Sequence, residues 1–376
     1  MNDVNPKSLF RPTWATIDLH ALAHNYNLIK NKLPAHTGVL AMIKADAYGH
    51  GVLPVARMLK ILGVSAFGVA TVEEGLELRT VGIDTQILVM GGLMGLGVQA
   101  SGRMIEAGLT PVIHSTDVLD ALNNDAAKFG RKIGVHLKVD TGMSRLGVRP
   151  EFLPQLLDKI SHCNNLFVEG VMTHLAEADQ SHVSGLQMGR FLACKKTIEN
   201  KLGKIKIWHI ANSMAIMRGG PMEIADVDEV WVRPGIALYD KVMRIESKVA
   251  LLKRVPEGVK VSYGGTFTTT RPTRLAVVPI GYADGYPWSA SGKAQVLLDG
   301  KRLPVVGRVT MDMIIVDVTD LENVSVGDEV VLLGKQGGEE IEIQELADWA
   351  GTITYEILCG ISKRMPRVYV NYGTCA

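Results

Sequence analysis

Short apolar runs alternate with longer amphipathic segments from the start of the chain to about residue 244. Eight of the apolar runs have the length and composition of buried strands, and helical spacing of apolar residues marks segments between them. This alternation is typical of a (β/α)8 TIM-like barrel, in which eight parallel strands close into a ring. A doubly wound open sheet is the alternative, because strand count alone does not prove closure. The predicted strands are Gly38–Ile43, Ala66–Ala70, Gln86–Met90, Pro111–His114, Gly134–Asp140, Val168–Thr173, Lys206–Ile210 and Glu229–Val232.

The predicted N-terminal domain is of the α/β class and covers residues 12–244. A barrel of this kind needs a helix after each strand to cover the outside of the ring. Segments with the spacing of such helices are Val72–Val81, Thr116–Phe129, Glu151–Ser161 and Gly185–Lys201.

The pattern changes beyond residue 245. Short β-like runs are separated by Gly, Asp and Pro turns, which predicts a mostly β C-terminal domain over residues 245–376. Only Ile343–Ala350 looks helical there, and the strand-like Thr13–Asp18 near the N-terminus can pair with either domain. The predicted strands of this domain are Lys248–Arg254, Val261–Thr269, Leu275–Ile280, Gln295–Leu298, Leu303–Asp317 and Glu329–Leu333.

The composition argues against several classes of protein. A net charge of +1 gives no reason to expect nucleic acid or an anionic membrane as a partner. No apolar run approaches the ~20 residues of a membrane helix, and the polar start Met1–Lys7 lacks the apolar core of a signal peptide. The cysteines are scattered, which indicates neither a zinc site nor a disulfide framework and fits a reducing cytoplasm. They are Cys163, Cys194, Cys359 and Cys375.

Lys44 lies at the end of the first predicted strand, where the polar, Gly-containing segment 45–51 turns the chain. A lysine in this position faces a βα loop and is suited to Schiff-base chemistry, because burial lowers the pKa of the ammonium and favours the neutral, nucleophilic amine. The alternative is a solvated lysine at a strand end. The residues that follow decide between these interpretations.

Other reactive side chains fall at the same end of the predicted barrel, where the catalytic groups of such folds lie. Asp140 ends the fifth strand, and Arg145 is in the loop after it. They are joined by His174 at the end of the sixth strand, His209 in the seventh and Arg233 after the eighth. Five such placements at one end of a barrel favour a functional site over coincidence.

The fifth strand also carries a lysine in an unusual position. Side chains alternate between the faces of a strand, so His136, Lys138 and Asp140 share one face. An inward ion pair between Lys138 and Asp140 is one interpretation. A buried lysine is costly unless it is paired or modified, so modification of Lys138 is the other.

The loops after the last two strands have the chemistry of a phosphate site. Ser213 follows Asn212 where a helix is predicted to begin, and Gly235 and Ile236 offer backbone N–H groups at the next turn. Hydroxyls and backbone N–H groups at helix N-termini bind phosphate, and barrels often use these two loops for it. Ordinary N-capping by Ser213 is the alternative. Neither a GxGxxG motif nor a P-loop is present to indicate a nucleotide.

These segments together resemble the alanine racemases, the pyridoxal-phosphate-dependent family of fold type III. The resemblance runs in order along nearly the whole chain, with Thr310 where many members have cysteine and Gly265 where alanine is common. The stretches that carry it are Ala41–Gly51, Leu137–Gly147, Met172–His174, His209–Ser213, Val232–Tyr239, Val261–Gly264, Gly281–Tyr286, Gly307–Asp312 and Gly351–Tyr355.

The resemblance implies a two-base racemisation of alanine. Lys44 would hold pyridoxal 5'-phosphate through a Schiff base and serve one face of the substrate Cα, while Tyr282 would serve the other. His209 and Arg233 would supply a positive environment, and His174 would pack against the cofactor ring. Arg233 would face the ring nitrogen, and since an arginine cannot accept its proton, the ring would be a weaker electron sink with little transamination.

The resemblance also implies binding roles and no metal. Arg145 and the Met311 backbone would hold the substrate carboxylate. Lys138 matches a position that is carbamylated to N6-carboxylysine in some members, and the resulting anion could orient Arg145. The cofactor phosphate would be bound by Tyr48, Ser213, Gly235, Ile236 and Tyr355.

Family members are homodimers with shared active sites, so Tyr282 and Met311 would act at the partner's barrel. The implied role is to supply D-alanine for peptidoglycan in the cytoplasm. A serine or broad-specificity racemase of the same fold is the closest alternative. A basic amino-acid decarboxylase would have no use for the Tyr282 motif, and pyridoxal-phosphate carrier proteins lack a β domain.

Overall fold

The structure is a computed structural model that describes residues 10–93, 95–178, 180–220 and 224–371. Two expectations, on the N-terminal segment Met1–Lys7 and on Cys375, fall outside these ranges. The chain forms two compact units. The barrel unit comprises Ala23–Ala47 and Val52–Leu238, and the β unit comprises Met1–Leu22, Tyr48–Gly51 and Tyr239–Ala376.

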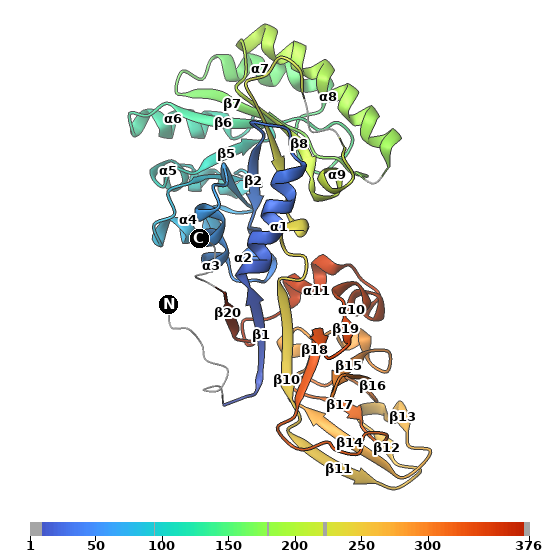
Figure 1. Ribbon diagram of the computed structural model, residues 1–376. Helices are drawn as coiled ribbons and strands as arrows, with labels where there is room; N and C mark the ends of the chain where they lie inside the picture. The colour runs from blue at the N-terminus through green and yellow to red at the C-terminus, as the bar shows by residue number, and fades with distance from the viewer. Residues whose placement is uncertain (1–9, 94, 179, 221–223, 372–376) are drawn as a thin grey trace. The chain divides into compact units, whose positions relative to one another are not determined.

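Eight strands of the barrel unit, all within the described ranges, form a closed barrel of parallel neighbours (Figure 1). Closure is shown by the pairing of the first strand with the last, where Gly38 and Val39 register with Trp231 and Val232. The open-sheet alternative is therefore wrong. The strands are β2 (Gly38–Met42), β3 (Ala66–Val69), β4 (Gln86–Val89), β5 (Thr110–Ile113), β6 (Ile133–Lys138), β7 (Leu166–Met172), β8 (Ile207–Asn212) and β9 (Glu229–Arg233).

The barrel strands are apolar on both faces because the interior is packed and helices cover the outside. All four residues of β3 are buried, as are Val39 to Met42 of β2. The predicted helices are confirmed to within a few residues at each end. The helices are α1 (Leu19–Lys32), α3 (Val52–Ile61), α4 (Val72–Thr80), α5 (Ser101–Glu106), α6 (Leu119–Lys128), α7 (Leu153–Ser161), α8 (Ser181–Leu202) and α9 (Ser213–Met217), with α1 beginning in the β unit.

The β unit contains a seven-stranded sheet in its described part, with the order β16-β15-β18-β10-β1-β20 and β19 paired to β18. The N-terminal strand β1 (Thr13–Asp18) runs antiparallel to β10 and parallel to β20, so it lies in this unit. The other members are β10 (Met243–Lys248), β15 (Gln295–Leu298), β16 (Lys301–Pro304), β18 (Glu329–Gln336), β19 (Glu339–Ile341) and β20 (Arg367–Val370).

Two smaller sheets complete the β unit: β11-β14-β17 and the pair β12-β13. The predicted strand Lys248–Arg254 is split, because β10 ends at Lys248 and a strand of the three-stranded sheet begins at Leu251. The predicted strand Leu303–Asp317 is likewise two strands with an intervening loop. The strands are β11 (Leu251–Val255), β12 (Lys260–Val261), β13 (Phe267–Thr268), β14 (Thr273–Val278) and β17 (Ile314–Asp317).

The predicted helix of this unit is present as α10 (Ile343–Ala350), but the expectation that it would be the only one is wrong. A second helix, α11 (Thr354–Gly360), follows it after a turn at Gly351, whose φ is +72°. The sequence did not indicate α11 because its seven residues are too few for a clear apolar period. No helix in the described part of the chain is long and apolar enough to cross a lipid bilayer.

Candidate active site

Lys44 begins a turn of left-handed backbone at the end of β2. The segment is labelled α2 (Lys44–Tyr48), but Ala45, Asp46 and Ala47 have φ values of 53°, 54° and 53°. The left-handed region costs an L-residue with a side chain roughly 1–2 kcal/mol, and only Gly adopts it freely. Tyr48 follows with a φ of 54°, and four consecutive residues in this region persist only where neighbouring groups fix them.

Two carboxylates provide that constraint. Glu74 Oε1 accepts the Ala45 N–H at 2.7 Å, and Asp46 Oδ1 accepts the Val52 N–H at 2.7 Å. The other oxygen of Glu74 accepts the Ala70 N–H at 2.6 Å, while the Thr71 side chain completes a capping box at the start of α4. Glu74 thus joins the helix after β3 to the residue next to Lys44, whose own side chain is half-buried.

Arg233 lies at the end of β9 with 3% of its surface exposed. Its Nη2 donates to the carbonyls of Thr173 at 2.6 Å and Ile210 at 2.9 Å, and it lies 3.2 Å from His174 Nδ1. Burial lowers its pKa to about 9, which still leaves it charged at neutral pH. A buried, fixed cation therefore stands at the mouth of the barrel.

A chain of buried imidazoles extends from Arg233 into the barrel. Arg233 Nη1 lies 3.3 Å from His209 Nδ1, and His209 Nε2 lies 2.9 Å from His136 Nδ1. Since a guanidinium can only donate, His209 accepts at Nδ1 and donates from Nε2. His136 then accepts at Nδ1 and directs its Nε2–H toward Glu169, 3.8 Å away. Burial lowers the pKa of both histidines, so both rings are neutral. The expectation that His209 adds positive charge is therefore wrong, and of the pair His209 and Arg233 only Arg233 does so.

Three cationic side chains act on the buried Lys138 at the strand ends. The pKa of Lys138 is lowered to about 8 by burial and then by Arg233, Arg145 and Lys44, with Asp140 as the opposing carboxylate. The same cations and burial lower the pKa of His174 to about 3, which keeps its imidazole neutral. This end of the barrel therefore has an excess of positive charge.

Asp140 does not serve as the ion-pair partner of Lys138. Its Oδ1 accepts the backbone N–H groups of Gly142, Met143 and Ser144 at 2.9–3.0 Å and so caps the loop that leads to Arg145. Lys138 itself is 5% exposed, and in the described ranges no ion pair joins it to a carboxylate. The ion-pair interpretation of this strand is wrong, and a buried lysine among cations is left.

Ser213 connects the loops after β8 and β9. Its Oγ accepts the N–H of Gly235 at 2.8 Å and that of Ala237 at 3.2 Å, next to Ile236 at the start of η4 (Ile236–Leu238). The N-cap of α9 is Asn212, whose side chain accepts the Ala215 N–H at 3.1 Å. The N-capping alternative for Ser213 is therefore wrong, and its hydroxyl lies among backbone N–H groups.

The remaining predicted residues belong to the β unit. Tyr282 lies in the 3-10 turn η6 (Tyr282–Asp284), with 45% of its side chain exposed, and Met311 is 51% exposed. The two segments are joined by the hydrogen bond from the Ala283 N–H to the Met311 carbonyl at 3.0 Å. Tyr48 is buried against the Tyr239 and Tyr355 rings, with centroids 4.9 and 6.0 Å away.

The sequence did not single out the residues that fix these two segments, Glu74 and Asp284. Thr71 and Glu74 have the spacing of a capping box, and Asp284 lies within the family motif Gly281–Tyr286, so each had a local signal. No local signal identified the partner of Asp284, because Arg11 binds it from 273 residues away in the sequence.

Comparison with known proteins covers nearly the whole chain. The family model described as "Alanine racemase, N-terminal domain" matches residues 17–241, and the model described as "Alanine racemase, C-terminal domain" matches residues 242–369. The chain is 41% identical to the alanine racemase of Geobacter sulfurreducens, over 96% of this chain and 98% of that one. It is 40% identical to that of Halothermothrix orenii, over 97% and 98%.

Solved structures agree with these matches. The crystal structure of alanine racemase from Bacillus anthracis with bound L-Ala-P superposes with a TM-score of 0.88 at 32% sequence identity, covering 97% of each chain.

Proposed function

The chain belongs to the alanine racemase family, and from that premise we propose how its residues interconvert L-alanine and D-alanine. It is an enzyme of the racemase class. We propose pyridoxal 5'-phosphate as its cofactor, Lys44 and Tyr282 as its two bases, and the barrel mouth as the binding site.

The excess of positive charge at the strand ends carries this proposal. Burial and then Arg233, Arg145 and Lys44 lower the pKa of Lys138 there, with Asp140 as the opposing carboxylate. Lys138 and Arg233 are buried, Lys44 is half-buried and Arg145 is exposed. Buried cations are costly unless anions balance them. A cofactor phosphate and a substrate carboxylate supply such anions, and a carbamate on Lys138 would supply a third.

The donor set fits pyridoxal phosphate. Backbone N–H groups of Gly235 and Ile236 and the Ser213 hydroxyl would bind its phosphate, with Tyr48 and Tyr355 adding phenolic hydroxyls. Lys44 would hold it covalently, His174 would pack on the ring, and Arg233 would face the ring nitrogen. When bound, this cofactor withdraws electrons from the substrate Cα and so makes its proton acidic.

Two proton-transfer groups on opposite faces then complete racemisation. The Lys44 amine exchanges a proton with one face of Cα, which we assign to D-alanine, and the Tyr282 hydroxyl exchanges one with the L face. Neutral His174 and His209 are poor proton donors, because burial and Arg233 lower their pKa values. Proton transfer is thereby restricted to the two bases.

Arg145 and the Met311 backbone N–H would orient the substrate through its carboxylate, since a guanidinium binds carboxylates with defined geometry. Lys138 is suited to carbamylation because its pKa of about 8 leaves a substantial neutral fraction at neutral to mildly alkaline pH. The carbamate anion would stand among the cations that lower this pKa, including Arg145.

We further propose a homodimer in which Tyr282 and Met311 act at the partner's barrel. The support within the β unit is that Tyr282 and Met311 are exposed there, with other large apolar side chains that are roughly half exposed or more. The others include Tyr263, Trp288, Met313 and Ile353. Family membership also supports a cytoplasmic role in supplying D-alanine for peptidoglycan.

The test is incubation with pyridoxal phosphate and L-alanine in heavy water, with Cα deuteration followed by NMR and chirality by chromatography. Deuterated D-alanine with little pyruvate is expected. Deuteration without inversion would contradict the assignment of a second base. No exchange with alanine would contradict the substrate.

A further inference from the structure

Tyr282 is carried by a turn that a single buried carboxylate closes. Asp284 Oδ2 accepts the Gly281 N–H at 2.9 Å, and the Asp284 N–H donates to the Gly281 carbonyl at 3.0 Å. A Cβ at Gly281 would collide with the Thr310 carbonyl oxygen, and one at Gly285 with that of Gly360. The backbone of the turn is therefore held closely between two other segments.

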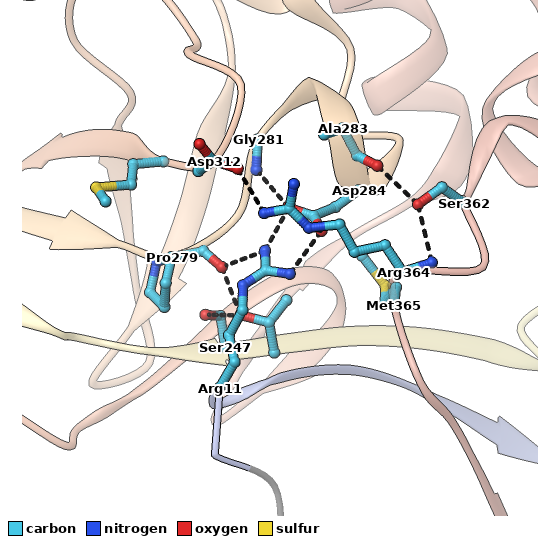
Figure 2. Close-up of polar contacts among 12 residues, drawn as sticks. Arg11, Ser247, Pro279, Gly281, Ala283, Asp284, Asp312, Ser362, Arg364 and Met365 are labelled. Atoms are coloured by element: carbon cyan, nitrogen blue, oxygen red, sulfur yellow. Dashed lines mark hydrogen bonds and ion pairs between the residues drawn. The ribbon is translucent and has the colours of Figure 1, made fainter.

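Asp284 is fully buried and binds two arginines, as Figure 2 shows. Arg11 approaches it with both terminal nitrogens, Nη1 donating to Oδ1 at 2.7 Å and Nη2 to Oδ2. Arg364 Nε lies 3.2 Å from Oδ1. Both oxygens thus have cationic partners, which offset the cost of burying a carboxylate.

The same arginines connect the Tyr282 turn to its surroundings. Arg11 Nη2 also donates to the Pro279 carbonyl at 2.7 Å, immediately before the turn. Arg364 Nη2 donates to Asp312 Oδ1 at 2.5 Å, next to Met311 (Figure 2). The network therefore fixes both segments to which we assign a role in the β unit, the one with the base and the one with the carboxylate-binding N–H.

The chain after α11 closes the network from the other side. The Ser362 N–H donates to the Asp284 carbonyl at 3.1 Å, and the Ser362 hydroxyl donates to the Ala283 carbonyl at 2.7 Å. The Tyr282 side chain is 45% exposed, so its position depends largely on its backbone. That backbone is held by Asp284 and also by hydrogen bonds from the Tyr282 N–H to the Thr310 carbonyl and from the Ala283 N–H to the Met311 carbonyl, both at 3.0 Å.

We propose that Asp284, held by Arg11 and Arg364, is a positioning residue for the Tyr282 base. Asp284 does not touch the reacting atoms; it sets where the Tyr282 hydroxyl lies, because its side chain closes the turn that carries Tyr282. This inference rests on the proposed two-base function. A displacement of about 1 Å in a reacting group can cost about 10²-fold in rate, so loosening the turn slows proton transfer on one face only.

The test is the holoenzyme with Asp284→Asn, which keeps the side-chain shape and removes the charge. Cα exchange in heavy water is measured from L-alanine and from D-alanine. We expect proton removal from L-alanine to fall about 10- to 100-fold, and proton removal from D-alanine by Lys44 to change less than about threefold. In the reaction that starts from D-alanine, deuterated D-alanine should therefore increase relative to L-alanine.

An equal loss of exchange from both enantiomers, or no change in their ratio, would overturn the proposal. Arg302→Gln is the matched control, because Arg302 binds Glu339 and Glu345 in the same unit without joining the network at Asp284. It should lower the melting temperature and leave the exchange ratio unchanged. If the wild-type enzyme exchanges neither enantiomer, the proposed function fails instead, so the two failures are distinguishable.

Arg364→Lys provides the same test if Asp284→Asn does not fold, since it keeps the charge and leaves Arg11 in place. It should shift the exchange ratio in the same direction, by less. A double mutant adds a second readout. If Asp284 acts through Tyr282, then Asp284→Asn should cause no further loss of L-alanine exchange in a Tyr282→Phe background; an additive loss would contradict this mechanism.

Discussion

The two proposed bases are held by similar devices in different surroundings. In the barrel unit, Glu74 accepts the N–H of Ala45, the residue after Lys44. In the β unit, Asp284 accepts the N–H of Gly281, the residue before Tyr282. Glu74 is partly exposed and binds backbone N–H groups, whereas Asp284 is fully buried and also binds two arginines.

The difference follows from what each fold supplies. In a parallel barrel the strand ends already converge, so a base at a strand end needs only its turn fixed. A mostly β unit has no such convergence point. An irregular turn there must be fixed by tertiary contacts, and the Asp284 network provides them at the cost of burying charge.

The largest effect is expected from Lys44→Ala. Racemisation should fall on the order of 10⁴-fold or more, because both the covalent attachment and one base are lost. Absorbance of the bound cofactor and a chiral assay are the measurements. Lys60→Ala is the matched control, since Lys60 is a surface lysine paired with Asp84. Substantial racemisation by Lys44→Ala would show that Lys44 is not one of the two bases and that the barrel unit supplies none.

Tyr282→Phe should retain the cofactor and lower proton removal from L-alanine about 10²- to 10⁴-fold, because only the acid–base hydroxyl is lost. Tyr26→Phe, at a tyrosine of α1 outside the proposed site, is the control. Heavy-water exchange from each enantiomer separates the two faces. Full racemisation by Tyr282→Phe would refute the two-base assignment.

Combining these two inactive variants tests whether the regions cooperate across a dimer. In a mixed dimer of Lys44→Ala and Tyr282→Phe subunits, a shared site would pair the intact Lys44 of one chain with the intact Tyr282 of the other. Co-expression should then restore about one quarter of the wild-type activity for random pairing. If both bases came from one chain, every site would carry a defect and no activity would return.

Glu74→Gln is expected to have a smaller effect than Tyr282→Phe. It should slow proton removal from D-alanine, whereas Asp284→Asn should slow proton removal from L-alanine. The amide can accept one of the N–H groups of Ala45 and Ala70 and presents its own N–H₂ to the other, so one charge-assisted bond of about 1–2 kcal/mol is lost. Proton removal from D-alanine should fall about fivefold. Glu77→Gln, on the exposed side of α4, should be neutral. A loss confined to L-alanine would contradict the comparison.

The smallest effect concerns Lys138. Its pKa is about 8 in the folded barrel and 10.5 without perturbation, so the unmodified folded chain binds fewer protons between these values and its stability should rise with pH there. At fixed dissolved CO₂, carbamate should also increase from pH 6 to 9 because the neutral amine reacts. The measurement is ¹³C NMR with labelled bicarbonate. A carbamate signal that persists in Lys138→Met, but is lost in Lys132→Met, would refute the assignment.

Local pattern predicted the regular parts of this fold. The eight barrel strands were evident because each is a short apolar run and helical segments separate several of them, and α10 was placed at its observed bounds. The pattern failed where structure is irregular. The predicted strand Val261–Thr269 is interrupted by the turn η5 (Tyr263–Gly265), in which Gly264 has a φ of 72°. Alternation of apolar residues cannot reveal such a turn.

The sequence by itself located the eight strands and identified the reactive side chains, because periodicity and motif composition are local properties. That the strands close into a barrel was decided by the pairing of β2 with β9. Only the tertiary structure decided the surroundings of the reactive side chains. It placed Asp140 on its own loop instead of on Lys138, put Lys44 beside a strained turn, and brought Arg11 to Asp284 from the other end of the chain. The burial and charge around a side chain depend on which distant segments pack against it. Its pKa and its position therefore depend on the tertiary structure.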